Sequence, residues 1–257
     1  MKNLQDKKLQ NLINYGDCFQ LGDHILICGD SRDSKLLEKV IGKQKISLVI
    51  TDPPYGVEYT ENKAGFSKVK MDRQILNDDI VSELQYSKFT KDWIIPILPH
   101  LEKKNTFYIF NSDKMLFALR DGMIQSRIKY SQLLIWIKNH AVIDRKDYLP
   151  MHELIAVGWH GTHAFRKAKD KSIIFCPKPS KSSLHPTQKP ISLLRRLILN
   201  STLIGDFIYD CFGGSGSTMM ACEQTKRKCI MIEFDPRYCQ TIIDRCDKIF
   251  GIKAKRI

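Results

Sequence analysis

The feature that most constrains the fold is an alternation of short apolar runs, rich in β-branched residues, with segments of helical pattern. Such alternation predicts a mainly parallel β-sheet covered by helices. Seven strands are predicted, at His24 to Cys28, Ile46 to Thr51, Thr106 to Phe110, Gln132 to Ile137, Leu154 to Gly158, Phe207 to Asp210 and Lys228 to Glu233. Six helices are predicted, at Ser34 to Ile41, Val81 to Leu101, Lys114 to Gln125, Pro190 to Asn200, Ser217 to Thr225 and Pro236 to Phe250.

The length favours one domain over two. A chain of 257 residues lies near the upper end of what one hydrophobic core supports. We therefore expect a single α/β domain over residues 1–257, with insertions at about 56–79 and 138–184. Long connections in a compact domain are usually functional or disordered.

The apolar runs and cysteines indicate where the protein works. No segment approaches the roughly 18 uninterrupted apolar residues of a membrane span, and the polar N-terminus is unlike a secretory signal. The eight cysteines contain no C-x-x-C pair, so we expect buried thiols and no metal. A cytoplasmic location without a membrane or metal partner follows as an expectation.

The net charge points to a polyanionic partner. Forty-one Lys and Arg against 28 Asp and Glu give a formal charge of +13. Between His160 and Lys189, which we call the basic stretch, seven Lys and Arg stand against one Asp, with Phe165 and Phe175 interleaved. This concentration favours nucleic acid. A generally basic surface is the alternative.

The first chemical motif is Asp52-Pro53-Pro54-Tyr55, directly after a buried strand. In open α/β sheets, ligands bind at that place. Two prolines make a stiff turn with exposed carbonyls between a carboxylate and an aromatic ring, which suits an amine such as that of adenine. The Asp52 side chain and a proline carbonyl can accept the amine protons while Tyr55 stacks on the base. The alternative is an ordinary Asp-Pro turn.

The second motif is the glycine-rich run from Phe207 to Thr218, which reads as a strand, a turn and a helix start. Glycines there let the backbone approach a ligand closely. Twenty residues after Gly213, Glu233 ends the next strand, where an acid hydrogen-bonds a nucleoside ribose. A dinucleotide enzyme would show a similar glycine turn.

Together with the run from His185 to Pro190, these motifs resemble the amino-DNA methyltransferases of bacteria and phages, over about Gly22 to Phe250. The order of the motifs is similar to that of the β class. The resemblance implies a circularly permuted Rossmann-like, S-adenosylmethionine-dependent methyltransferase fold, with a seven-stranded, mostly parallel sheet and helices on both faces. It also sets four strands side by side, so that one cleft collects Asp30, Glu233, Asp210 and Asp52.

Roles carried over from the family remain implications of the resemblance. The methionine end of S-adenosylmethionine would be lined by the glycine motif, its ribose held by Glu233 and its adenine contacted by Asp30. The His185 to Pro190 run would close over the methionine part. Cys211 departs from the family, which usually has proline there. The expected cofactor-binding residues are Asp30, Thr187, Lys189, Asp210, Phe212, Gly213, Gly216 and Glu233.

The activity that the resemblance implies is methylation of the N6 amino group of adenine in double-stranded DNA, by base flipping. Asp at the first position of the catalytic motif favours adenine, since the family's cytosine enzymes favour Ser. N4-cytosine methylation, an RNA substrate and a non-catalytic nucleic-acid-binding protein are the alternatives. The two insertions are candidates for target recognition and DNA contact, and a homodimer or a partner chain is an open alternative for gripping the duplex. The expected catalytic residues are Asp52, Pro53, Pro54 and Tyr55.

Overall fold

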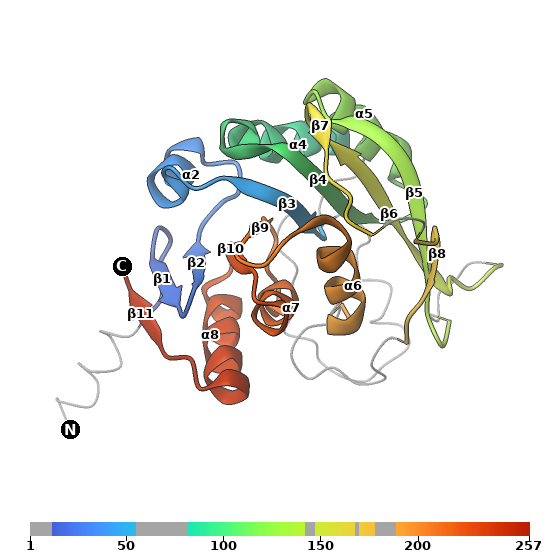
Figure 1. Cartoon of the computed structure of the whole chain (residues 1–257). Helices are drawn as coiled ribbons and strands as arrows, with labels where there is room; N and C mark the ends of the chain where they lie inside the picture. The colour runs from blue at the N-terminus through green and yellow to red at the C-terminus, as the bar shows by residue number, and fades with distance from the viewer. Residues whose placement is uncertain (1–11, 55–81, 142–146, 168–169, 178–188) are drawn as a thin grey trace.

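A large β-sheet runs through the part of the chain that the computed structural model describes, residues 12–54, 82–141, 147–167, 170–177 and 189–257 (Figure 1). The order along the sheet is β11-β1-β2-β10-β9-β3-β4-β6-β5-β8, and β7 pairs with β4. The strands are β1 (Cys18–Leu21), β2 (His24–Cys28), β3 (Ile46–Thr51), β4 (Leu101–Asn111), β5 (Lys129–Ile137), β6 (His152–Trp159), β7 (Thr162–His163), β8 (Ile173–Phe175), β9 (Phe207–Asp210), β10 (Lys228–Glu233) and β11 (Ala254–Arg256).

All seven predicted strands form, as β2, β3, β4, β5, β6, β9 and β10. The strands β2, β10, β9, β3 and β4 run parallel as neighbours, whereas β6 is antiparallel to both β4 and β5. The predicted neighbourhood of β2, β10, β9 and β3 is therefore confirmed. The predicted circular permutation and the mostly parallel sheet are confirmed as well.

The number of strands differs from the prediction, because the described residues form eleven strands rather than seven. The four additional strands are short: β1, β8 and β11 lie at or near the ends of the strand order, and β7 pairs with one end of β4. β1 forms a hairpin with β2, and β11, whose sequence is Ala-Lys-Arg, pairs with β1. A strand of this kind is held by backbone hydrogen bonds to its neighbour and carries no apolar pattern that would reveal it.

Helices cover both faces of the sheet (Figure 1). Residues of α2, α4 and α5 pack in one buried apolar cluster, and residues of α6, α7 and α8 pack in another, with alternating residues of the central strands pointing into each. The bounds are α2 (Ser34–Ile41), α4 (Glu83–Ile94), the 3₁₀ helix η1 (Ile95–His100), α5 (Leu116–Gln125), α6 (Ile191–Ser201), α7 (Ser217–Thr225) and α8 (Pro236–Phe250).

The predicted helix over 81–101 is shorter than expected. α4 begins after Ser82, which forms a capping box with Gln85, and ends at Ile94. A 3₁₀ helix follows, and it contains Pro96 and Pro99. Proline has no N–H and its ring clashes with the preceding turn, so the α-helical ladder stops here and residue 101 begins β4.

The cysteines are buried, as predicted. All eight lie within the described residues, and each is a free thiol inside the protein. Cys28, Cys229 and Cys222 are fully enclosed in the core. They act as small apolar side chains.

Candidate active site

Four acids lie at the edge of the sheet where the parallel strands end. Glu233 and Asp210 are the last residues of β10 and β9. Asp52 directly follows β3, and Asp30 lies two residues beyond β2. Since these strands are neighbours and run in the same direction, their ends meet at one edge, which is where ligands bind in open α/β sheets. The acids predicted to converge therefore share this edge.

Asp210 is a buried carboxylate held by uncharged donors. The Thr51 hydroxyl donates to Asp210 Oδ1 at 2.8 Å, and the Phe212 N–H donates to the same oxygen at 3.2 Å. Burial raises the pKa of Asp210 to about 7, an effect that these donors only partly offset. Thr51 is the last residue of β3, so its bond joins the strand of the Asp-Pro-Pro motif to the strand of the glycine motif.

Glu233 is bound by the backbone through both of its carboxylate oxygens. The Gly214 N–H donates to Oε2 at 2.7 Å, and the Asp235 N–H donates to Oε1 at 2.8 Å. Burial raises the pKa of Glu233 to about 7, although both donors act to lower it. The bond from Gly214 ties the end of β10 to the glycine turn, so the acid and the turn form one unit.

Packing requires the glycines of this turn. A Cβ on Gly213 would lie 2.7 Å from Met231 Cγ, on β10. Gly216 has a φ of +78°, and a Cβ there would lie 3.0 Å from Ile242 Cγ1, on α8. These two glycines therefore let the turn sit against the protein itself. The aromatic residue between the motif's Asp and these glycines, Phe212, is half-buried and packs against Phe89 and Trp93 with ring centroids 5.7 and 5.8 Å away.

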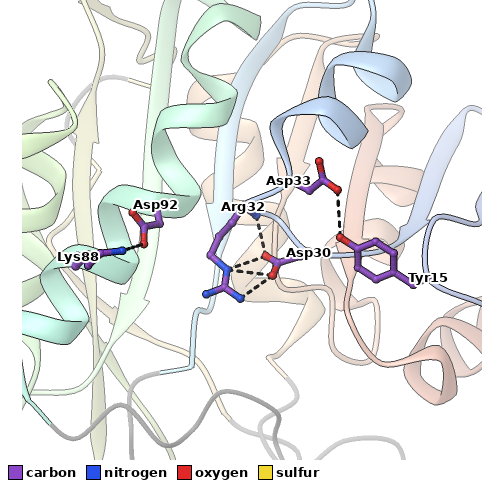
Figure 2. Close-up of polar contacts among 6 residues, drawn as sticks. All are labelled: Tyr15, Asp30, Arg32, Asp33, Lys88 and Asp92. Carbon is purple, nitrogen blue, oxygen red and sulfur yellow. Dashed lines mark hydrogen bonds and ion pairs between the residues drawn. The ribbon is translucent and has the colours of Figure 1, made fainter.

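Asp30 forms a bidentate ion pair with Arg32 (Figure 2). Arg32 Nε lies 2.9 Å from Asp30 Oδ1, and Nη2 lies 2.6 Å from Oδ2. Burial acts to raise the pKa of Asp30, but the Arg32 side chain and N–H hold it below its ordinary value. Figure 2 shows Arg32 reaching toward α4, where its guanidinium lies 5.9 Å from the centroid of the Phe89 ring.

Two aromatic residues beside Asp30 were not predicted from the sequence. The rings of Tyr15 and Phe234 meet edge to face with centroids 6.3 Å apart, and the Tyr15 hydroxyl donates to Asp33 Oδ2 at 3.2 Å (Figure 2). Both rings are partly exposed. A signal for Phe234 was available, since it directly follows the acid at the end of β10. None pointed to Tyr15.

Asp52 is bonded to a residue far away in the chain. Lys189 Nζ donates to Asp52 Oδ2, in an ion pair between two side chains with little exposure. Burial acts to lower the pKa of Lys189, but the carboxylates of Asp52 and Glu153 outweigh it, so the pKa lies above its ordinary value. Lys189 was predicted to contact the cofactor. The structure joins it to the acid of the catalytic motif instead, and a cofactor contact stays a prediction.

The structure describes two of the three residues that follow Asp52 in its motif. Pro53 is buried and Pro54 is half-buried at the end of β3. Tyr55, predicted to stack on the base, lies outside the described residues. So does Thr187, predicted to contact the cofactor.

Glu153 is part of the site, and sequence reasoning missed it. Its carboxylate lies 3.2 Å from Lys189 Nζ through Oε2 and 2.9 Å from Lys138 Nζ through Oε1. Glu153 belongs to β6, and Lys138 follows β5, the neighbouring strand. An acid within an apolar strand run was the available signal, because a buried acid requires a partner.

The described part of the basic stretch carries exposed cations. Arg166, Lys167 and Lys171 are exposed. Asp170 lies among them and pairs with Arg196 of α6, whose Nε donates to it at 3.0 Å. The Arg196 guanidinium holds the pKa of Asp170 well below its usual range. This pair ties the stretch to α6.

The described residues show neither a metal site nor a membrane helix. Within them, no cluster of three or more His, Cys, Asp or Glu side chains is arranged to hold a metal ion. None of the helices described has the length and apolar character needed to cross a membrane.

The chain is similar to known DNA methyltransferases in sequence and in fold. It is 26% identical over 260 residues to the type II methyltransferase M.HpaI of Haemophilus parainfluenzae, covering 89% of this chain and 76% of that protein. A crystal structure of the M1.HpyAVI–SAM complex matches 83% of this chain and 96% of its own, with a TM-score of 0.60 and 23% identity. The cytosine-N4-specific PvuII DNA methyltransferase matches 89% of each chain, with a TM-score of 0.70 and 16% identity.

At these identities the two solved structures show a shared fold. A model of the DNA methylase family matches residues 46–244, most of the chain. That range contains the Asp-Pro-Pro motif, the glycine turn and Glu233, the residues that meet at the edge of the sheet. The chain therefore belongs to the DNA methylase family.

Proposed function

We propose that this protein is a site-specific DNA methyltransferase that transfers the methyl group of S-adenosylmethionine to the exocyclic N6 amino group of adenine in duplex DNA. The observation that carries the proposal is the hydrogen bond from Thr51 to Asp210. It places the acid that would serve the target amine, Asp52, next to the strand that would bind the cofactor. A transfer between two bound molecules requires such adjacency.

The acids at the sheet edge fit S-adenosylmethionine, the molecule in the M1.HpyAVI complex. When bound, S-adenosylmethionine supplies an electrophilic methyl group on a positively charged sulfur. Asp210 and Glu233 are buried carboxylates whose donors, a hydroxyl and backbone N–H groups, are uncharged, which suits a ligand that brings positive charge and hydroxyl groups. We propose that Glu233 accepts hydrogen bonds from the ribose hydroxyls and that Asp30 contacts the adenine of the cofactor. Part of the ion pair between Arg32 and Asp30 would then be broken.

Asp52 would act on the target amine. The lone pair of an adenine amino group is delocalised into the ring, so the nitrogen is a poor nucleophile until acceptors bind its protons and favour a pyramidal geometry. The Asp52 carboxylate and the carbonyl of Pro53 or Pro54 supply these acceptors. With the cofactor bound, the nitrogen would take the methyl group as the carbon–sulfur electron pair stays on sulfur, and Asp52 would accept the proton that the nitrogen gives up.

The target base has to leave the duplex, because the amino group is out of reach inside the stack. Tyr55 would stack on the extruded base. The phosphates would be held by the basic stretch, which exposes Arg166, Lys167 and Lys171. The insertions at about 56–79 and 138–184 stay the candidates for target recognition, and a homodimer and a cytoplasmic location stay predictions.

Adenine is favoured over cytosine by the motif and not by the fold. The PvuII enzyme shares the fold and is cytosine-N4-specific, so the fold accommodates either base. Asp52 stands where the family's cytosine enzymes favour Ser.

The test is modification of DNA by the protein. Genomic DNA from cells that express the wild type, and separately Asp52→Ala, would be sequenced for modified bases and their context. We expect N6-methyladenine at a recurring sequence in the first sample only. Finding N4-methylcytosine instead would show that the target base is cytosine. If purified protein that binds the cofactor modified no base on any duplex tested, the proposed activity would be contradicted.

A further inference from the structure

Four ionic side chains form a chain of alternating charge that ends on the proposed catalytic acid. Lys138 Nζ lies 2.9 Å from Glu153 Oε1, Glu153 Oε2 lies 3.2 Å from Lys189 Nζ, and Lys189 Nζ donates to Asp52 Oδ2. The sequence separates these residues widely. They come from the ends of β5 and β3, from β6, and from the residue pair that precedes α6.

The chain of charges is buried. The side chains of Lys138 and Lys189 are 4% and 7% exposed, and that of Glu153 is 14% exposed. Aromatic rings flank the ammonium groups: Lys189 Nζ lies 5.0 Å from the centroid of Phe110, and Lys138 Nζ lies 5.6 Å from that of Trp136. Such surroundings exclude water and strengthen each electrostatic contact.

Stability alone gives no reason for this arrangement. Removing four charged groups from water is costly, and buried ion pairs can often be replaced by apolar residues without loss of stability. The series of four charged side chains ends on Asp52, which needs its negative charge to accept the target amine protons. This end point indicates a role in the reaction.

We propose that Lys189, anchored by Glu153 and through it by Lys138, is a positioning residue that keeps Asp52 ionised and oriented toward the target amine. The inference rests on the proposed function. It reassigns Lys189, in the run from His185 to Pro190, from the cofactor to the catalytic acid, and it gives roles to Glu153 and Lys138, which lie outside the recognised motifs.

The other groups that face Asp52 make this role necessary. Asp210 on β9, when ionised, repels the Asp52 carboxylate, whereas the Tyr86 hydroxyl of α4, which also faces Asp52, is uncharged. Glu153 adds a second carboxylate on β6. Negative neighbours disfavour ionisation of a carboxyl group, whereas a cation in contact favours it. Lys189 supplies that cation, and Glu153 and Lys138 hold it in place.

The first experiment measures the rate of methylation against pH for the wild type and Lys189→Met, on a duplex that contains the target adenine. We expect the acid limb of the kcat profile to move to higher pH by about 1 to 3 units, the shift typical of losing an adjacent opposite charge. Activity should recover toward high pH, and the affinity for S-adenosylmethionine, measured by calorimetry, should stay within about threefold of the wild type. A large loss of cofactor affinity with an unmoved acid limb would overturn the proposal.

Lys189→Arg is a second variant that tests the proposal even if Lys189→Met does not fold. It keeps the positive charge, so its acid limb should stay near that of the wild type even if kcat falls. An acid limb displaced as far as in Lys189→Met would contradict the electrostatic role. Thermal melting of each variant shows whether it is folded.

The anchoring role of Glu153 has its own test. Glu153→Ala removes the second carboxylate that holds Lys189 and should lower kcat by about tenfold to a hundredfold, the range typical of losing a partner that orients a metal ligand. The double variant Glu153→Gln with Lys138→Met keeps an acceptor oxygen for Lys189 and leaves no unpaired cation, so it should recover most of the loss. If it is as impaired as Glu153→Ala, the anchoring role is wrong.

These outcomes separate the inference from the proposed function. If the wild type forms no N6-methyladenine, the proposed function fails. If the wild type methylates adenine and the variants leave both the acid limb and kcat unchanged, the function stands and the inference fails.

Discussion

The acids at the two halves of the sheet edge are held by different kinds of partner. In the half formed by β9 and β10, Asp210 and Glu233 accept from backbone N–H groups and a hydroxyl, and burial raises the pKa of each to about 7. In the half formed by β3 and β6, Asp52 and Glu153 are bonded to lysines. The described donors to the first pair are uncharged, whereas the second pair has lysines of the protein as counterions.

This difference fits the proposal that one edge binds both the cofactor and the target base. A ligand with positive charge stabilises the ionised acids of the first half, so its binding is coupled to their deprotonation. Acids that already have cations stay ionised whether or not the substrate is bound. The predictions below test this division, starting with the largest expected effect.

The two halves should separate under mutation. Asp52→Ala is expected to abolish methylation while the affinity for S-adenosylmethionine survives, because the proposed role of Asp52 is to bind the target amine. Glu233→Ala should instead weaken the cofactor first, by about 1.5 to 3 kcal/mol, the typical value of a hydrogen bond to a charged group. Calorimetry and a methylation assay on both variants measure the pair of effects. Loss of cofactor binding in Asp52→Ala together with normal binding in Glu233→Ala would reverse the division.

The ligand-free protein should lose stability as the pH rises toward 7, through Asp210. A folded-state pKa near 7 lies above the ordinary value of an aspartate, so the stability that this group contributes is fully present below about pH 4 and is lost as the pH rises through 7. Asp210→Asn removes this titration. At pH 8 its free energy of unfolding should therefore exceed that of the wild type by on the order of 1 to 4 kcal/mol, at about 1.4 kcal/mol per pKa unit. At pH 4 the two free energies should be close.

Thermal melting from pH 4 to 8, with and without S-adenosylmethionine, measures the effect. The cofactor should remove the advantage of Asp210→Asn, because positive charge favours the ionised acid. An identical pH dependence in the two proteins would show that Asp210 does not titrate in this range.

In the substrate half, the ring of Tyr55 is expected to hold the extruded base. Tyr55→Phe should keep most of the activity, since stacking needs only a ring, whereas Tyr55→Ala should lose on the order of 1 to 3 kcal/mol. A mismatch opposite the target adenine lowers the cost of extrusion and should partly restore Tyr55→Ala. The rates on matched and mismatched duplexes decide, and a Phe variant as impaired as Ala would make the hydroxyl essential.

The smallest expected effect concerns the grip on DNA. Replacing Arg166, Lys167, Lys169 and Lys171 by Ala should flatten the slope of log affinity against log salt, because each phosphate contact releases condensed counterions. Binding titrations from low to high salt measure the slope. Replacing Lys35, Lys39, Lys43 and Lys45 of the α2 region with Ala removes the same charge elsewhere and is the control. Equal flattening by both sets would show that the overall positive charge, and not the basic stretch, sets the salt dependence.

Much of the fold was predictable because its signals are local. The bounds of α2, α7 and α8 agree with the predicted ones, since caps, prolines and turn glycines mark helix ends within a few residues. The central strands were predictable from their unbroken apolar runs, which are typical of strands buried on both faces. The short strands β7, β8 and β11 were not, because two or three residues are too few to show a strand pattern and each strand depends on pairing with a neighbour.

The sequence by itself determined which acids meet at the edge of the sheet, because each of Asp52, Asp210 and Glu233 stands at a strand end beside a recognisable turn. Only the tertiary structure decided what those acids are bonded to. Lys189 lies 137 residues after Asp52, and no local pattern links them. An ion pair between distant segments depends on the order of the strands and on the direction of each side chain, and both are set when the whole sheet packs. The bond between Asp52 and Lys189 is a property of the folded chain.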